Sequence, residues 1–354
     1  MNSNMRVFVW VALALAALFA GSLTALADDS IRLPAMPEMQ FSIRWPLSSV
    51  VFMPNGSYLA AADDKQGVYL WNLKSRKKEW EVELPIVGSV SNEDVALAFT
   101  GDGKTLLLAS DVRDPLVLDA SSGKTLRSLG SEGEWFAPAI SIWRKDRTEK
   151  AVTSSSGDLH LWNPSDGKEV LALKRAGRTV VSLQVARDVP RIVLGLEARG
   201  AEEDSDTGRV LVRELPSGRI LFDVRQSKFP VRQLAISPKG DRLVGASDGQ
   251  LVCWSIDRKE RLWSKKEECR CLAMSSDGKT LAYGSDSRLV LCDVLSGTAF
   301  SETRYGSRSD TISAVTFSGD ATSIAVGTED GAIAIWRLLP GLGATDPGQR
   351  SERR

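Results

Sequence analysis

The sequence predicts an all-β protein, because one strand-rich unit is repeated seven times along most of its 354 residues. Each unit has an apolar run, a turn rich in Gly and Asp, a second apolar run, a turn of small residues, and a third run that ends in Trp or a substitute. The clearest copies are residues 231–254 and 312–336. Short runs of Val, Ile, Leu, Phe and Thr between turn residues are typical of strands. Outside the N-terminus the sequence shows no convincing helical period of 3.6 residues.

The end of the third run forms a column that counts the units. Gly-containing turns follow most column positions, as the positive φ of a tight hairpin requires. A repeat of about 40–45 residues with four strands is typical of one β-propeller blade. The sequence therefore predicts a seven-bladed β-propeller of four-stranded antiparallel blades, with the column tryptophans buried. The column, at steps of 38 to 51 residues, is Trp71, Leu118, Trp162, Arg213, Trp254, Cys292 and Trp336.

The two ends of the repeat region predict how the ring closes. The seventh unit ends at Trp336 with no fourth strand after it, whereas a strand-like segment, residues 39–45, precedes the first unit. A propeller avoids an exposed edge when an N-terminal strand completes the last blade. We therefore expect the strand near Phe41 to pair with the strand that holds Trp336. Trp80 and Trp263, each nine residues past a column Trp, are expected on fourth strands and packed between blades.

The second and third runs also carry a family signature. Residues 247–254 read Ser-Asp-Gly-Gln-Leu-Val-Cys-Trp, residues 329–336 read Glu-Asp-Gly-Ala-Ile-Ala-Ile-Trp, and residues 155–162 follow more loosely. In these motifs the chain resembles the WD-repeat β-propellers, of the kind seen in the G-protein β subunit, over residues 39–339. The Gly-His pair and the Trp-Asp ending of that family are missing from the sequence, so its Asp-His-Ser-Trp hydrogen-bond network is not expected. The resemblance implies an interaction platform whose blades are held mainly by packing.

The N-terminus predicts export. Arg6 precedes the apolar run 7–19, and Ala25 and Ala27 form a small-x-small cleavage site. The run is short for a membrane span, which needs about 20 residues; an uncleaved anchor is the alternative. The mature protein is then expected in the periplasm or outside the cell. The expected divisions are a cleaved signal peptide at 1–27, a surface leader at 28–38, the propeller at 39–339 and a disordered tail at 340–354.

The composition indicates which class of partner to exclude and whether the cysteines form disulfides. The chain has 45 basic and 45 acidic residues, so loss of Arg6 with the signal leaves a net charge near −1. Binding to nucleic acid needs a basic surface, and we therefore expect no such partner. The four cysteines fall on strands that are too far apart for a disulfide, whose Cα atoms lie within about 7 Å. Buried free thiols are expected instead.

Few residues point to catalysis. His160, the only histidine, is expected as an ordinary strand position, and a Ser-His-Asp triad or a His-based metal site would need that residue. The Gly-Lys-Thr triplets at 103–105, 123–125 and 278–280 lack the upstream glycine of a phosphate loop and are interpreted as hairpin turns. We expect no enzyme activity, no catalytic residue, no metal site and no cofactor.

The candidate binding residues lie in loops expected on one rim. Residues 197–208 lengthen the fourth unit between its second and third strands, and four carboxylates gather there. This segment is either a solvated loop or a Ca²⁺ site, since clustered carboxylates suit that ion. The connections between blades carry aromatic and Arg residues, the residue types that contribute most to binding energy at protein interfaces. These side chains either contact a partner or pack between the blades. The candidates are Glu202, Glu203, Asp204 and Asp206 in the loop, with Trp135, Phe136, Phe229, Arg304, Tyr305 and Arg308 in the connections.

Two functions are compatible with these patterns. The first is a monomeric, non-enzymatic scaffold that binds a protein or peptide, or else a glycan, on its loop rim. The second rests on turns such as residues 119–126, through which the chain also resembles the quinoprotein-type propellers. That resemblance implies a cofactor-binding enzyme or a cofactor-free assembly factor of the cell envelope. We expect the scaffold, with no membrane span after cleavage of the signal.

Overall fold

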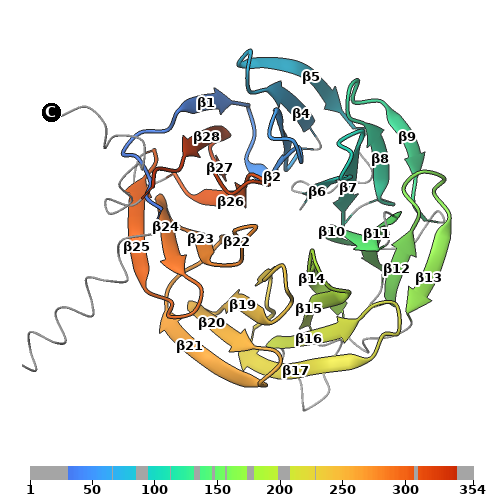
Figure 1. The fold of residues 1–354 in the computed structure, drawn as a ribbon. Helices are drawn as coiled ribbons and strands as arrows, with labels where there is room; N and C mark the ends of the chain where they lie inside the picture. Colours follow the sequence, from blue (N-terminus) through green and yellow to red (C-terminus); the bar gives the residue numbers. More distant parts are fainter. Residues whose placement is uncertain are drawn as a thin grey trace, which may run out of the picture.

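The computed structural model describes residues 31–340 apart from 66, 85–94, 112, 131–135, 146–147, 156–157, 174–178, 198–207, 228 and 307–309. Over these residues the strands form seven four-stranded antiparallel sheets, arranged as blades around a central axis (Figure 1). The predicted all-β, seven-bladed propeller is therefore confirmed. The predicted signal peptide and the tail beyond residue 340 lie outside the described residues.

The blades follow one another along the chain, with the first strand of each nearest the axis (Figure 1). Blade 1 comprises β2 (Leu47–Phe52), β3 (Tyr58–Asp63), β4 (Gly67–Asn72) and β5 (Lys77–Glu83); blade 2 comprises β6 (Val95–Phe99), β7 (Thr105–Ser110), β8 (Leu116–Asp119) and β9 (Thr125–Ser128). Blade 3 comprises β10 (Phe136–Lys145), β11 (Thr148–Ser155), β12 (Asp158–Trp162) and β13 (Glu169–Leu173); blade 4 comprises β14 (Thr179–Val185), β15 (Arg191–Glu197), β16 (Gly208–Glu214) and β17 (Ile220–Ser227). Blade 5 comprises β18 (Gln233–Ile236), β19 (Arg242–Ser247), β20 (Gln250–Ser255) and β21 (Glu260–Lys266); blade 6 comprises β22 (Cys271–Met274), β23 (Thr280–Ser285), β24 (Arg288–Asp293) and β25 (Ala299–Arg304). Blade 7 comprises β26 (Ile312–Phe317), β27 (Ser323–Thr328), β28 (Ala332–Arg337) and, as its fourth strand, β1 (Met39–Ser42).

The ring closes through β1, as the sequence predicts. β1 pairs antiparallel with β28, and Phe41 lies opposite Ile333 in the register. The Phe41 ring then stacks on Trp71 of blade 1, with 5.5 Å between ring centroids, so the strand joins blade 7 to blade 1 by both hydrogen bonds and packing. Upstream, Arg32 forms an isolated bridge with Leu339. Both ends of the described chain are thus attached to the last blade.

The core lies between the blades, because the inner strands of each blade carry apolar residues on both faces. The second and third strands are almost fully buried, and each hydrophobic cluster draws residues from neighbouring blades. Trp71, Trp162, Trp254 and Trp336 are at most 7% exposed, which confirms the core role predicted for these tryptophans. Sheets buried on both faces read as continuous apolar runs, and this explains why the repeats lack strict alternation.

Trp80 shows how neighbouring blades lock together. Its indole Nε1 donates a hydrogen bond of 2.9 Å to the carbonyl of Ala120 in blade 2. Its ring lies beneath Gly123, where a Cβ would come within 2.8 Å of Trp80 Cε3. Trp263 repeats the arrangement against blade 6, with a 2.9 Å bond to the carbonyl of Val294. The predicted packing of these two tryptophans between blades is confirmed.

One hydroxyl–indole pair survives from the hydrogen-bond network of the resembled family. Trp162 Nε1 donates to Thr153 Oγ1 at 2.8 Å inside blade 3. The same position relative to Trp336 is Gly327, which has no side chain to accept a bond. The Trp336 indole nitrogen is accordingly buried with no hydrogen-bond partner among the described residues. The blades are therefore held mainly by packing, as expected from the missing Gly-His pairs.

Candidate functional site: the central channel and its loop-bearing mouth

One rim of the ring carries both the connections between blades and the turns between second and third strands. Backbone hydrogen bonds join the two kinds of segment: Asp64 N donates to Pro46 O at 3.0 Å, and Glu267 N donates to Gly249 O at 2.9 Å. Ile43, in the connection from β1 to β2, donates to Gly331 in the β27–β28 turn at 2.9 Å. This arrangement fits the sequence-based expectation that such segments share one rim.

A central channel runs along the propeller axis. Its cavity volume is about 1560 Å³, and its wall is formed by residues of the innermost strands of all seven blades. Apart from aliphatic groups, this wall presents hydroxyl and amide side chains such as Ser182, Gln184, Gln233 and Thr316. The channel interior can therefore accept either a hydrogen-bonding or an apolar segment, and it sets no charge requirement.

Charge is concentrated at the loop-bearing end, which we call the channel mouth. Each charged lining residue lies just before a first strand or at the turn between a second and a third strand, so all six belong to this rim. Four carboxylates face two guanidinium groups, and Arg270 is paired with Glu329 at 3.3 Å. Among the described lining residues, the mouth thus carries a net negative charge. Its charged residues are Asp64, Glu197, Arg232, Asp248, Arg270 and Glu329.

Two adjacent carboxylates in blade 1 have different roles. Asp63 is fully buried and accepts hydrogen bonds from the backbone N–H groups of Lys65 and Gly67 and from the Tyr69 hydroxyl, at 2.7–2.8 Å. It therefore builds the β3–β4 turn. Asp64 faces the channel, and burial raises the pKa of its carboxyl group above the ordinary value. Its Oδ1 atom is buried without a hydrogen-bond partner among the described residues, so a donor from a bound molecule could satisfy it.

The structure places few of the sequence-predicted binding residues at this mouth. Phe229 lines the channel cavity and is 56% exposed, and its carbonyl accepts a 2.9 Å bond from Ser247 Oγ. Arg304 lies exposed at the end of β25, whereas Tyr305 is half-buried and meets Trp336 edge-on at 5.4 Å. Phe136 begins β10, and nothing further is described of its side chain. The others lie outside the described residues: Trp135, Glu202, Glu203, Asp204, Asp206 and Arg308.

Sequence reasoning missed the charged residues of the mouth. The usable signal was positional, because each follows a second strand or precedes a first strand of its repeat. Arg232, for example, lies directly before β18, and Asp248 lies in the β19–β20 turn. An alignment of the repeats shows charged residues at the end of second strands and just before first strands. These two positions, rather than the aromatic residues of the connections, identify the mouth.

Other residues singled out in the sequence have structural roles. His160 lies on β12, where its Nδ1 is 2.7 Å from Glu169 Oε1 and its ring stacks on Trp162. The three Gly-Lys-Thr triplets form hairpin turns, with Gly103, Gly123 and Gly278 at positive φ. Among the described residues no group of His, Cys, Asp and Glu is placed to hold a metal ion.

The four cysteines are free, as the sequence predicts. Three are buried, and Cys269 is half-buried. Burial raises the pKa of the Cys271 thiol to about 12 and that of Cys292 to about 11. These thiols are therefore neutral at physiological pH and serve as small apolar core residues.

Comparisons with known proteins agree with the fold. A family model described as outer membrane protein assembly factor BamB matches residues 42–301, and one described as WD domain, G-beta repeat matches residues 300–337. The chain is 26% identical over 264 residues to a WD repeat-containing protein, the WDS homolog of Arabidopsis thaliana.

That alignment covers 70% of this chain and 47% of the plant protein, so this chain matches only about half the length of its relative. Within the residues that the structure describes, no helix has the length and apolar character needed to cross a membrane. With seven blades, a closing strand and matches across nearly all of the ring, the chain is a WD-repeat β-propeller and belongs to the family described as outer membrane protein assembly factor BamB.

Proposed function

We propose that this chain is an exported, non-enzymatic scaffold that holds a basic segment of an envelope protein at its channel mouth. The observation that carries the proposal is that the charged residues of the channel lining gather at one end. All six charged lining residues lie at the loop-bearing mouth, and carboxylates outnumber guanidinium groups there by four to two. The buried Oδ1 of Asp64, which has no hydrogen-bond partner among the described residues, supplies an acceptor for a Lys or Arg side chain.

The family description supports an assembly role in the envelope. The matched family is described as an outer membrane protein assembly factor, and the N-terminal residues have the pattern of a signal peptide. WD-repeat relatives favour protein binding over catalysis, although fold analogy alone identifies no partner. We therefore place the protein in the periplasm, where it would hold client or partner chains during assembly.

The alternative, a quinone-dependent enzyme, fits the channel poorly. An anionic quinone would need a surplus of cationic side chains or a bound cation, whereas the mouth has a surplus of carboxylates. These carboxylates are also distributed over blades 1, 4, 5 and 7 rather than clustered. Purified protein is expected to show no visible absorbance, and a quinone-like band would contradict the scaffold proposal.

Site-specific photo-crosslinking in cells tests the mouth directly. A photoreactive residue in place of Arg232, at the mouth, should give adducts with envelope proteins. The same residue in place of Lys239, in the β18–β19 turn at the opposite end of blade 5, is the control. Exchanging Glu197 and Glu329 for Gln should reduce the Arg232 adducts, since a basic segment loses its counter-charges. Equal adducts at both positions would refute a role for the mouth.

A further inference from the structure

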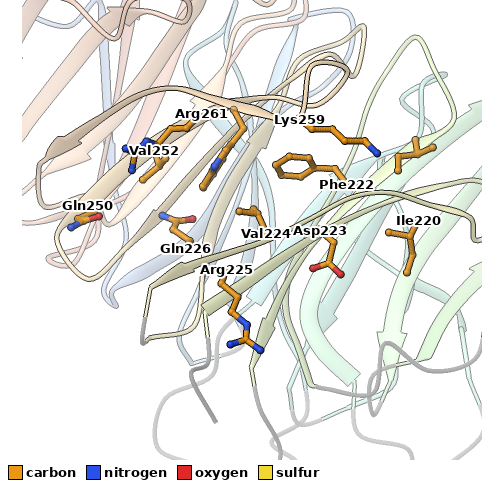
Figure 2. Close-up of a pocket in the computed structure, with 12 residues that line it drawn as sticks. Ile220, Phe222, Asp223, Val224, Arg225, Gln226, Gln250, Val252, Lys259 and Arg261 are labelled. Atoms are coloured by element: carbon orange, nitrogen blue, oxygen red, sulfur yellow. The ribbon is translucent and has the colours of Figure 1, made fainter. Parts of the chain in front are cut away.

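A second cavity lies outside the channel, on the outer side of the ring between blades 4 and 5 (Figure 2). Its volume is about 630 Å³. One wall is the outermost strand of blade 4, β17, and the other is formed by residues of β20 and of the β20–β21 hairpin. We call this cavity the lateral groove.

The groove lies at a junction where the packing of a Trp beneath a hairpin Gly of the next blade is absent. At the blade 1–2 and blade 5–6 junctions, a Trp from the outer strand packs beneath a hairpin Gly, either Gly123 or Gly297. At the blade 4–5 junction the equivalent residues in the repeat are Phe222 and Lys259. Lys259 keeps the positive φ of the turn, at 57°, but adds a Cβ that Gly123 and Gly297 lack. An aromatic ring cannot approach this hairpin as closely, and the space between the blades stays open.

The two walls differ in charge. Figure 2 shows Phe222, Val224 and Gln226 on the side of β17 that faces blade 5. Lys259 and Arg261 stand on the opposite wall, and both are exposed. Among the described residues, neither of these two cations forms a hydrogen bond or an ion pair with another side chain. The groove therefore has Phe222, which is 6% exposed, and Val224 on one wall, and two exposed cations on the other wall beside the buried Trp254.

The remaining charges of β17 do not neutralise these cations. Asp223 and Arg225 also belong to the cavity lining, but their side chains point away from those of Phe222 and Val224 (Figure 2). Asp223 also pairs with Arg209 of the neighbouring strand β16. Among the described residues no carboxylate pairs with Lys259 or Arg261, so an acidic group from another molecule could supply their counter-charge.

β17, which lines the groove, is also an edge strand, since no further described strand pairs with its outer side. It is the last strand of its sheet, eight residues long. The corresponding strand of blade 1, β5, carries five charged residues among seven, and such charges protect an edge from further pairing. β17 carries only two charged residues, Asp223 and Arg225, among eight. Strand addition to an exposed sheet edge is a common mode of peptide recognition, with alternate side chains giving specificity.

We propose that the lateral groove binds an extended, acidic peptide segment of another protein, which adds a strand to β17 and directs alternate carboxylates toward Lys259 and Arg261. This docking site is separate from the channel mouth and does not depend on the function proposed for the mouth. A basic segment is excluded from the groove by the same two cations that attract an acidic one.

Fluorescence anisotropy with two labelled peptides tests the proposal. One short peptide alternates valine and glutamate, and the other alternates valine and lysine. The acidic peptide should bind and the basic one should not. Exchange of Lys259 and Arg261 for Glu should weaken binding of the acidic peptide about tenfold or more, because two ion pairs become two repulsions. Lys239→Glu, in the exposed β18–β19 turn and outside the groove lining, makes the same change of charge at one site and should leave binding unchanged.

A variant that closes the groove provides the second test. Phe222→Trp combined with Lys259→Gly recreates the lock seen at the neighbouring junctions, so peptide binding should be lost while the thermal midpoint is maintained or raised. The proposal is overturned if the acidic peptide does not bind, if both peptides bind equally, or if the closed variant binds as before. Light scattering that reveals a dimer abolished by the closed variant would also overturn it, since the occupant would then be a second copy of the chain.

Discussion

Replacement of Gly123 by alanine tests the lock between blades 1 and 2. Gly123 has a φ of +71°, and a Cβ there would lie 2.7 Å from Val82 Cγ2 and 2.8 Å from Trp80 Cε3. The left-handed conformation should cost an alanine about 1–2 kcal/mol. Forcing the Trp80 ring and Val82 to move should cost a further about 1–3 kcal/mol, as other overpacked sites do. We expect Gly123→Ala to lower the free energy of unfolding by the sum of both effects.

Gly56 provides a matched control within the same protein. It has the same φ of +71° in the turn between β2 and β3, but a Cβ there would meet no atom within 4 Å. Gly56→Ala should therefore show the conformational cost alone, about 1–2 kcal/mol. The difference between the two variants isolates the packing of Trp80 beneath the hairpin of the next blade.

Urea unfolding followed by far-UV circular dichroism measures both variants. A double-mutant cycle with Trp80→Ala adds a direct test of the contact, because residues that touch are not additive. In that background Gly123→Ala should cost less than in the natural protein, since the ring that it displaces is gone. Equal destabilisation by Gly56→Ala and Gly123→Ala would refute the argument that the ring and the hairpin lock the blades.

Three further predictions concern the core and the closure. Thr153→Val should destabilise the fold by about 1–3 kcal/mol in urea, because it leaves the buried Trp162 indole N–H without an acceptor; an unchanged midpoint would contradict this. Because burial raises the pKa values of Cys271 and Cys292 to about 12 and about 11, their contribution to stability is complete below the unfolded thiol pKa of about 8.5 and is lost as the pH rises toward these values. Each thiol should steepen the fall in stability by up to about 1.4 kcal/mol per pH unit, and alanine at either position should flatten the curve. Removal of residues 1–42 should expose the edge of β28 and cause aggregation measurable by light scattering; a soluble monomer with the natural midpoint would show that closure is dispensable.

The architecture could be predicted because its signals are local. Turn residues, short apolar runs and the column that ends at Trp336 repeat within each unit, and they specify strands and hairpins before any blade meets another. Closure was also predictable, because a seventh copy without a fourth strand requires one from elsewhere. The structure confirms it in the pairing of Phe41 with Ile333.

The candidate sites could not be predicted in the same way. The mouth brings together Asp64 and Glu329, which are 265 residues apart in the sequence, and neither stands out within its own repeat. The search for exposed aromatic residues instead selected Tyr305, whose ring packs edge-on against Trp336. Aromatic residues in connections serve packing and binding alike, and only their surroundings separate the two roles.

The sequence by itself therefore determined the seven blades, the buried tryptophans and the closing strand, since strand period and turn chemistry act over a few residues. Tertiary structure alone decided where charge gathers and where a groove opens. Phe222 and Lys259 are ordinary residues in their own blades, and they create the lateral groove only because the curvature of the ring sets one against the other. Contacts between blades depend on the shape and charge of both contacting surfaces. The sequence of a single repeat specifies only one of these two surfaces.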